Sequence, residues 1–218
     1  MQKNIIIKNG KIFTCENNLI IENGFIIIEN GLIKAVDDMK NYNADENDSN
    51  VINADGLVIT PGFIDAHCHI GICEDSLGYE GEDANEETDP ITPQIRAIDA
   101  INPFDRAFKE ARDSGVTTAC VAPGSANAIA GQICVLKTAG KRVDNMVINP
   151  FLAMKMAFGE NPKSIYGTKN QSPNTRMATA ALVREELFKA QRYKQDMEKA
   201  EEDEDESFPD FDAKLDAL

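Results

Sequence analysis

Two histidines, His67 and His69, stand one residue apart in the segment GFIDAHCHIG, and they are the whole histidine complement of the 218-residue chain. They end an apolar run from Gly62 that reads as a β-strand. Side chains alternate along a strand, so both imidazoles project to one side while Cys68 points to the other. Two neutral imidazoles about 6–7 Å apart can converge on one divalent metal ion. The alternative is a pair of surface histidines at a strand end.

The elements that must position this pair follow it along the chain. An acidic connection spans 73–89, and the segment FDRAFKEARDSG predicts a helix with Phe104 and Phe108 on its apolar face. Strands that alternate with helices, without hairpin signals between them, predict a parallel sheet. Further strands are expected at Val116–Ala122, Ile133–Lys137, Met146–Ile148 and Phe151–Met156, and a further helix at Thr175–Lys199.

The first sixty residues have a different pattern. Runs rich in isoleucine and valine are separated by Asn9–Gly10, Asn23–Gly24 and Asn30–Gly31. Asn-Gly is preferred in tight hairpin turns because both residues tolerate positive φ. We therefore predict a small antiparallel β-domain over 1–60. At the other end, residues 201–218 form an acidic tail that is expected to be solvated or disordered.

Composition excludes several classes of protein. The formal net charge of −15 argues against nucleic acid as a partner, because phosphate binding needs clustered Lys and Arg. No apolar run approaches the ~20 residues of a membrane span, and no signal-peptide cleavage site is visible, so a cytoplasmic protein is expected. Five cysteines without a CxxC pair argue against a disulfide framework or a structural zinc site.

The stretch VITPGFIDAHCHIG, which follows the predicted β-domain, resembles the amidohydrolase superfamily, whose first barrel strand carries a His-x-His metal motif. The segments GVTTACVAPGSANAIAGQ and KMAFGENPKSIYG resemble its imidazolonepropionase-like branch. This resemblance implies an α/β fold in which a β-sandwich-type domain precedes the first part of a (β/α)8 TIM barrel over 61–200. It also implies metal-assisted hydrolysis of carbon–nitrogen bonds in a small amide substrate.

The resemblance assigns His67 and His69 as metal ligands, with zinc as the expected metal and iron, manganese or nickel as alternatives. Lys155 is the candidate for a carboxylated, bridging lysine, with Glu160 as the second candidate. Ordinary roles, as a strand-end lysine and a loop carboxylate, stay open for both. Arg96 and Arg176 are candidates for binding a substrate carboxylate, although most single arginines are simply solvated.

The sequence departs from the family pattern after His69, because no later histidine exists to supply the ligands of strands five and six. From Gly62 to the end there are 218 − 61 = 157 residues, whereas a complete barrel typically needs ~250. We therefore expect an N-terminal portion that is inactive alone and has no catalytic residue assigned. It would act as a homo-oligomer or with a separate C-terminal half. The alternative is a non-catalytic remnant.

Overall fold

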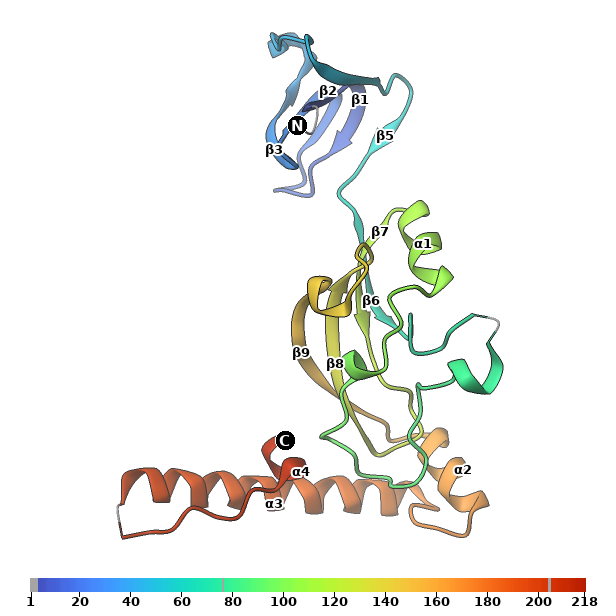
Figure 1. Cartoon of the computed structure of the whole chain (residues 1–218), viewed down its shortest axis with the longest axis vertical. Coiled ribbons are helices and arrows are strands. Elements are labelled where there is room, and N and C mark those ends of the chain that lie inside the picture. Colours follow the sequence, from blue (N-terminus) through green and yellow to red (C-terminus); the bar gives the residue numbers. More distant parts are fainter. Residues whose placement is uncertain (1–3, 76, 204) are drawn as a thin grey trace. The chain divides into compact units, whose positions relative to one another are not determined.

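The computed structural model describes residues 4–75, 77–203 and 205–218, and it divides the chain into two compact units, Met1–Gly62 and Phe63–Leu218 (Figure 1). Each unit is built on its own sheet. The predicted α/β class, with a β-rich domain preceding an α/β domain, is confirmed. Within the described ranges, no helix has the length and apolar character that crossing a membrane requires.

The first unit is a sheet with the strand order β3-β2-β1-β4, in which β5 also pairs with β1. β1 pairs with β2, and β2 with β3, in antiparallel fashion, while β4 and β5 run parallel to β1. The purely antiparallel domain is therefore a wrong prediction, and the sheet is mixed. The strands are β1 (Asn4–Phe13), β2 (Ile20–Glu29), β3 (Leu32–Asp38), β4 (Ser49–Asn53) and β5 (Val58–Ile59).

Only one of the three Asn-Gly pairs makes the predicted hairpin turn. Asn30–Gly31 connects β2 to β3, whereas Asn9–Gly10 lies inside β1 and Asn23–Gly24 inside β2. The pairing register shifts on both sides of Gly10, and a Cβ built there would lie 2.5 Å from Cδ1 of Ile59. The Asn9–Gly10 pair thus serves a β-bulge with close packing rather than a turn.

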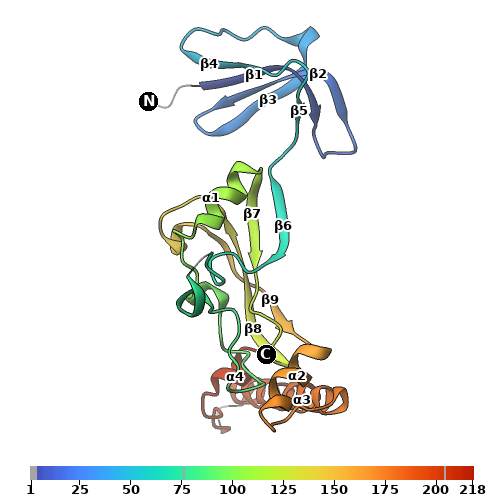
Figure 2. The same cartoon turned by 90° about the vertical axis from the view of Figure 1, so that its right-hand side faces the viewer.

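The second unit carries the histidine pair on a sheet with the order β6-β7-β8-β9. Its strands are β6 (Phe63–Cys68), β7 (Val116–Val121), β8 (Ile129–Lys137) and β9 (Val147–Met156). Its α-helices are α1 (Arg106–Asp113), α2 (Glu160–Thr168), α3 (Arg176–Glu202) and α4 (Ala213–Asp216). In both views α1 lies beside β7, which it precedes (Figures 1 and 2).

The parallel sheet is predicted correctly for its first pair of strands and wrongly for the rest. β6 and β7 are parallel, with α1 in the crossover between them, but β7–β8 and β8–β9 are antiparallel. The physical reason is the short connection between Val121 and Ile129, because a parallel return needs a crossover of about a dozen residues or more. The two expected strands around Met146–Met156 are the single strand β9.

The main core of this unit lies between the sheet and the segments around α1. Phe108 is 1% exposed and is the largest apolar side chain of this cluster. α1 begins after Asp105, whose side chain accepts a hydrogen bond from Ala107 N, and the chain leaves the helix at Gly115 with φ +88°. The other buried members are Ile72, Ala84, Ala97, Ile101, Ala119, Val121, Cys134, Leu136 and Met146.

The acidic tail differs from its prediction, because its last residues pack on the second unit. Lys214 forms an ion pair with Asp89 at 2.5 Å. Leu218 packs against a second cluster built on Ile91, Ile129 and Val183. The prediction of a solvated or disordered tail is therefore wrong for 213–218, where an ion pair and an apolar contact hold the end of the chain.

The sheet leaves apolar side chains exposed on its outer strands. β6 and β9 are its two end strands, and Ile64 on β6 is 67% exposed. On β9, Ile148, Phe151 and Leu152 are each about half exposed. Apolar side chains that gather on unpaired strand edges are typical of a surface that another segment or chain covers.

The free cysteines are expected to differ in how fast they react with a thiol reagent. Cys15 is exposed between β1 and β2, whereas Cys120 and Cys134 are buried in the second unit. Burial raises the pKa of Cys134 to about 11, so its reactive thiolate is scarce near neutral pH. We expect a disulfide reagent that releases a coloured thiol to modify Cys15 quickly, and the two buried thiols only after unfolding. The half-buried Cys68 and Cys73 remain in Cys15→Ser, so a fast phase of unchanged amplitude in that variant would contradict this assignment.

Candidate metal centre

The geometry of β6 brings the two histidines together at the end of the strand. β6 ends at Cys68, so His67 is its penultimate residue and His69 follows directly. The two imidazole rings have centroids 5.4 Å apart and an interplanar angle of 77°. His67 is exposed and His69 is half-buried. This distance is consistent with the prediction that both rings project to one side of the strand.

His69 is oriented by a backbone carbonyl at the end of the neighbouring strand. Its Nδ1 lies 2.8 Å from the carbonyl oxygen of Ala122, directly after β7. A carbonyl can only accept, so Nδ1 carries a proton, and in the neutral tautomer that this selects the lone pair is on Nε2. Metal-ligating histidines are commonly fixed in this way through their second nitrogen. Ala122 is therefore a contributor that sequence reasoning missed, and no local signal could have identified it.

Lys155 is brought to the histidine pair from β9. Its Nζ lies 3.5 Å from Nε2 of His67, although the two residues are 88 positions apart. Met154 and Met156 pack against the cluster around Ile129 and Val183. Since side chains alternate along a strand, this packing directs Lys155 to the opposite side of β9.

Both His67 and Lys155 are held toward their neutral forms. The pKa of His67 is lowered mainly by burial and further by the charges of Lys155 and His69, while Asp65 acts in the opposite direction. Burial also lowers the pKa of Lys155. Neutral imidazole is the form that binds metal, and a neutral amine is the nucleophilic form of lysine. The environment therefore favours the protonation states that a metal site needs.

Asp105 fixes the turn that follows His69. Its Oδ2 accepts a hydrogen bond from Gly71 N at 3.2 Å, while its Oδ1 accepts one from Ala107 N at 3.0 Å. Asp105 is 6% exposed, and its two hydrogen bonds tie the start of α1 to the turn after β6. Sequence reasoning missed this residue, although an aspartate directly before the apolar face of a helix is a recognisable N-cap.

The other predicted site residues lie elsewhere. Glu160 is the exposed first residue of α2 and lines a shallow cavity with Lys163 and Asn174. Arg176 is the exposed first residue of α3. The structure thus brings His67, His69 and Lys155 together, and the roles of Glu160 and Arg176 stay predictions.

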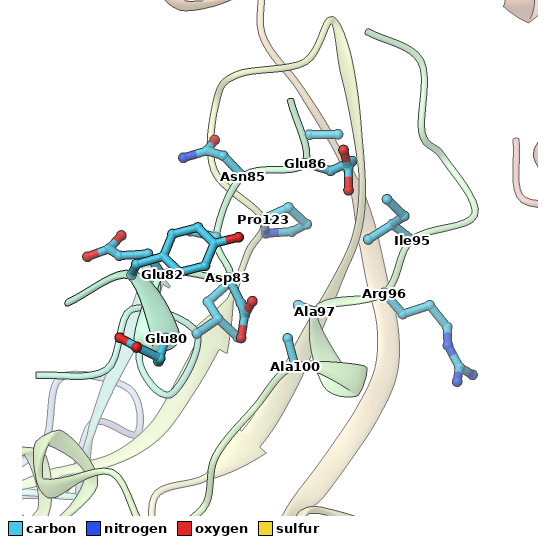
Figure 3. Close-up of a pocket in the computed structure, with 14 residues that line it drawn as sticks. Glu80, Glu82, Asp83, Asn85, Glu86, Ile95, Arg96, Ala97, Ala100 and Pro123 are labelled. Carbon is cyan, nitrogen blue, oxygen red and sulfur yellow. The ribbon is translucent and has the colours of Figure 1, made fainter. Parts of the chain in front are cut away.

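Arg96 lies at a cavity of about 450 Å³ whose lining includes four acidic side chains, Glu80, Glu82, Asp83 and Glu86 (Figure 3). Its guanidinium donates to both carboxylate oxygens of Asp99, at 2.8 and 2.6 Å, and extends away from Glu80 and Glu82 in Figure 3. The predicted role in binding a substrate carboxylate stays a prediction. Ile72 and Pro123, which also line this cavity, follow His69 and Ala122 closely in the chain.

A buried polar network anchors the connection between β7 and β8. The hydroxyl of Tyr166 donates to Oδ1 of Asn127, whose Nδ2 donates to Oγ1 of Thr92 at 2.8 Å. All three side chains are buried. The network joins α2, the β7–β8 connection and the segment after the acidic loop.

Replacing Tyr166 by phenylalanine is expected to lower the free energy of unfolding by about 1–3 kcal/mol, because the buried amide oxygen of Asn127 loses the donor from Tyr166. Urea unfolding followed by circular dichroism measures the change. The matched control is Tyr79→Phe, since the Tyr79 side chain is 91% exposed and should shift stability very little. Equal effects of the two substitutions would contradict a contribution from the network.

The donor set is that of a partial metal centre. Across residues 4–75, 77–203 and 205–218, no group of three or more His, Cys, Asp or Glu side chains is arranged to hold a metal ion. His67 and His69 could supply two nitrogen ligands, and Lys155 could add a third only in a neutral or carboxylated form. Catalytic zinc sites usually have three protein ligands.

No family model matches this chain, but a solved structure and several curated proteins are similar to it. The crystal structure of an amidohydrolase from Thermotoga maritima MSB8 superimposes with a TM-score of 0.87 and 36% sequence identity. That match covers 98% of this chain and 54% of the solved one. The fold of this chain, including the antiparallel β8 and β9, therefore resembles that of a solved structure over nearly its whole length.

Two curated proteins are similar over shorter stretches. The amidohydrolase tasK of Hapsidospora irregularis is 36% identical over 166 residues, which is 71% of this chain and 17% of that protein. An imidazolonepropionase of Clostridium tetani is 34% identical over 82 residues, or 30% of this chain and 19% of that protein. The chain thus spans about half of the solved relative and less than one fifth of these curated relatives.

Proposed function

Because this chain belongs to the amidohydrolase superfamily, we propose that it forms the metal-binding, N-terminal part of a hydrolase of carbon–nitrogen bonds. The observation that carries the proposal is the meeting of His67, His69 and Lys155 at the ends of β6 and β9. The substrate class is a small amide, cyclic amide or peptide-like compound. The similarity to imidazolonepropionase supports, as a finer proposal, that branch of the superfamily, and we propose a cytoplasmic location.

The residues fit a divalent metal ion as a half-set of ligands. His67 and His69 would hold it through their unprotonated nitrogens, and Lys155 would join as a carbamate between two ions. We propose zinc, which imidazole and carboxylate-type oxygen ligands suit, with iron, manganese or nickel as alternatives. A bound ion of this kind would lower the pKa of its water to about 7 and would polarise a carbonyl group.

The chain's own groups have defined tasks in this proposal. The carbonyl of Ala122 keeps the proton of His69 at Nδ1, so that Nε2 remains available for binding. Burial and the charges of Lys155 and His69 lower the pKa of His67, which favours its neutral form. Asp105 keeps the turn after His69 in place, which fixes the direction in which the imidazole points. No residue of the chain is assigned as the base that accepts the proton of water.

We further propose that the 218-residue chain is inactive alone and works with a polypeptide that supplies further histidines and an aspartate. The chain holds only two histidines, and its apolar strand edges on β6 and β9 support a partner that covers them. The partner would be a complementing C-terminal half or a second copy. The different-class alternative is a non-catalytic assembly protein or remnant that has the same fold.

The test is hydrolysis of a panel of N-acyl amino acids, cyclic amides and dipeptides in the presence of zinc. We expect no turnover by the chain alone, and turnover after addition of the part of the Thermotoga maritima relative that this chain does not cover. His67→Ala/His69→Ala is the control and should give none in either case. Metal-dependent turnover by the chain alone would contradict the need for a partner.

A mixture that binds but stays inactive would contradict the hydrolase proposal and favour the assembly protein. Complex formation is measured separately, by analytical ultracentrifugation of the same mixtures. The two measurements separate failure of assembly from failure of chemistry.

A further inference from the structure

The three Asn-Gly pairs of the first unit are in different environments, and this difference has a chemical consequence. We propose that Asn30 is a site of spontaneous deamidation, at which water converts the side-chain amide to a carboxylate. The same dipeptide at Asn9 and Asn23 is protected by the sheet. Asparagine is among the chemically labile residues, and a following glycine offers the least steric hindrance to the reaction.

The reaction needs only the chain and water. The backbone nitrogen of Gly31 loses its proton to the solvent and forms a bond to Cγ of Asn30. The bond between Cγ and Nδ2 breaks, and the amide nitrogen leaves as ammonia after taking up a proton. Water then adds to either carbonyl of the five-membered imide, and opening of the ring gives aspartate or isoaspartate. No electrons are exchanged with an oxidant or reductant.

Asn30 and Gly31 lie at the tip of the β2–β3 hairpin, where this ring can form. Both residues have positive φ, +52° and +80°, and both are exposed. A Cβ built on Gly31 meets no heavy atom within 4 Å. Leu32 and Ile33, at the start of β3, are 74% and 67% exposed, so little packing opposes a local opening of the tip.

The other two pairs lie inside paired strands. Gly10 and Gly24 are buried, and they face each other across the β1–β2 ladder. Gly24 also pairs with Asp38 on β3, so it is flanked on both sides. Nδ2 of Asn9 donates to Oδ1 of Asn53 at 2.8 Å. Formation of the ring would require local unfolding of the sheet, which costs far more than movement of a hairpin tip.

The two products affect the hairpin differently. Aspartate tolerates the left-handed conformation that Asn30 adopts, so it adds a negative charge and keeps the turn. Isoaspartate adds one methylene group to the main chain between Glu29 and Leu32, which pair directly across the turn. The loop length sets the register of a hairpin, so this product should loosen the pairing of β3.

The test is incubation of the full chain in mildly alkaline buffer at 37 °C, followed by tryptic digestion and fragmentation mass spectrometry. Asn23 and Asn30 fall in one tryptic peptide between Lys11 and Lys34, so their rates are compared within one molecule. Because strand residues react only through local unfolding, we expect Asn30 to convert at least about tenfold faster than Asn9 and Asn23. The peptide from Asn30→Asp provides the reference for the aspartate product.

The same incubation in urea removes the fold and is the matched control. There we expect the three asparagines to convert at comparable rates, since all three precede glycine. Similar rates at all three sites in the folded chain would overturn the proposal. So would protection of Asn30 in the folded chain, or a preference for Asn30 that persists in urea, because neither agrees with selection by the fold.

Discussion

Replacing His67 and His69 together by alanine is expected to lower the affinity of the chain for zinc by more than about 100-fold, since even residues that only orient ligands contribute ~10–100-fold. The two imidazoles are the whole histidine content of the chain, and their rings lie 5.4 Å apart. The measurement is equilibrium dialysis with zinc alone, followed by mass-spectrometric metal analysis. Equal zinc binding by the wild type and the double variant would show that the pair is not a ligand set.

Two further variants decide between the candidates for the third ligand. Lys155→Met removes the amine that lies 3.5 Å from His67 and should weaken zinc binding. Glu160→Gln changes an exposed residue at the start of α2 and should leave zinc binding unchanged. The reverse order of effects would assign the role to Glu160. Far-UV circular dichroism of each variant shows whether the fold is retained.

Replacing Phe108 by alanine is expected to lower the free energy of unfolding by about 3–5 kcal/mol, because it removes a fully buried aromatic ring and leaves a cavity. Phe108 is 1% exposed and belongs to the main core cluster of the second unit. Its ring also lies against Gly71, where an added Cβ would come within 2.8 Å of Cε2 of Phe108. The loss should therefore loosen the turn after His69 as well as the core.

Phe104 provides the matched control for this experiment. The two phenylalanines were expected on one apolar helix face, but Phe104 precedes α1 and is 74% exposed. Phe104→Ala should change the free energy of unfolding by no more than about 0.5 kcal/mol. Urea unfolding followed by circular dichroism measures both variants. A loss of similar size in the two would contradict the burial that distinguishes them.

The local patterns of the sequence were sufficient for the features that depend on a few neighbouring residues. Alternation along a strand places His67 and His69 on one side, because the side-chain period of a strand is two. The helix over 106–113 and its end at Gly115 follow from apolar spacing and from the conformational freedom of glycine. The helix is confirmed, and the 5.4 Å between the two imidazole rings is consistent with the alternation, because neighbours in the chain determine both features.

Only the tertiary structure decided which distant residues meet the histidine pair. Lys155 reaches His67 across 88 positions, and the carbonyl of Ala122 reaches His69 across 53. The Lys155 contact depends on the antiparallel pairing of β8 with β9, which strand patterns predict wrongly as parallel. The Ala122 contact depends on the parallel pairing of β6 with β7. The identical Asn-Gly pairs likewise form a bulge at Asn9 and a turn at Asn30. Strand pairing is set by packing between segments, and the residues within one segment do not specify it.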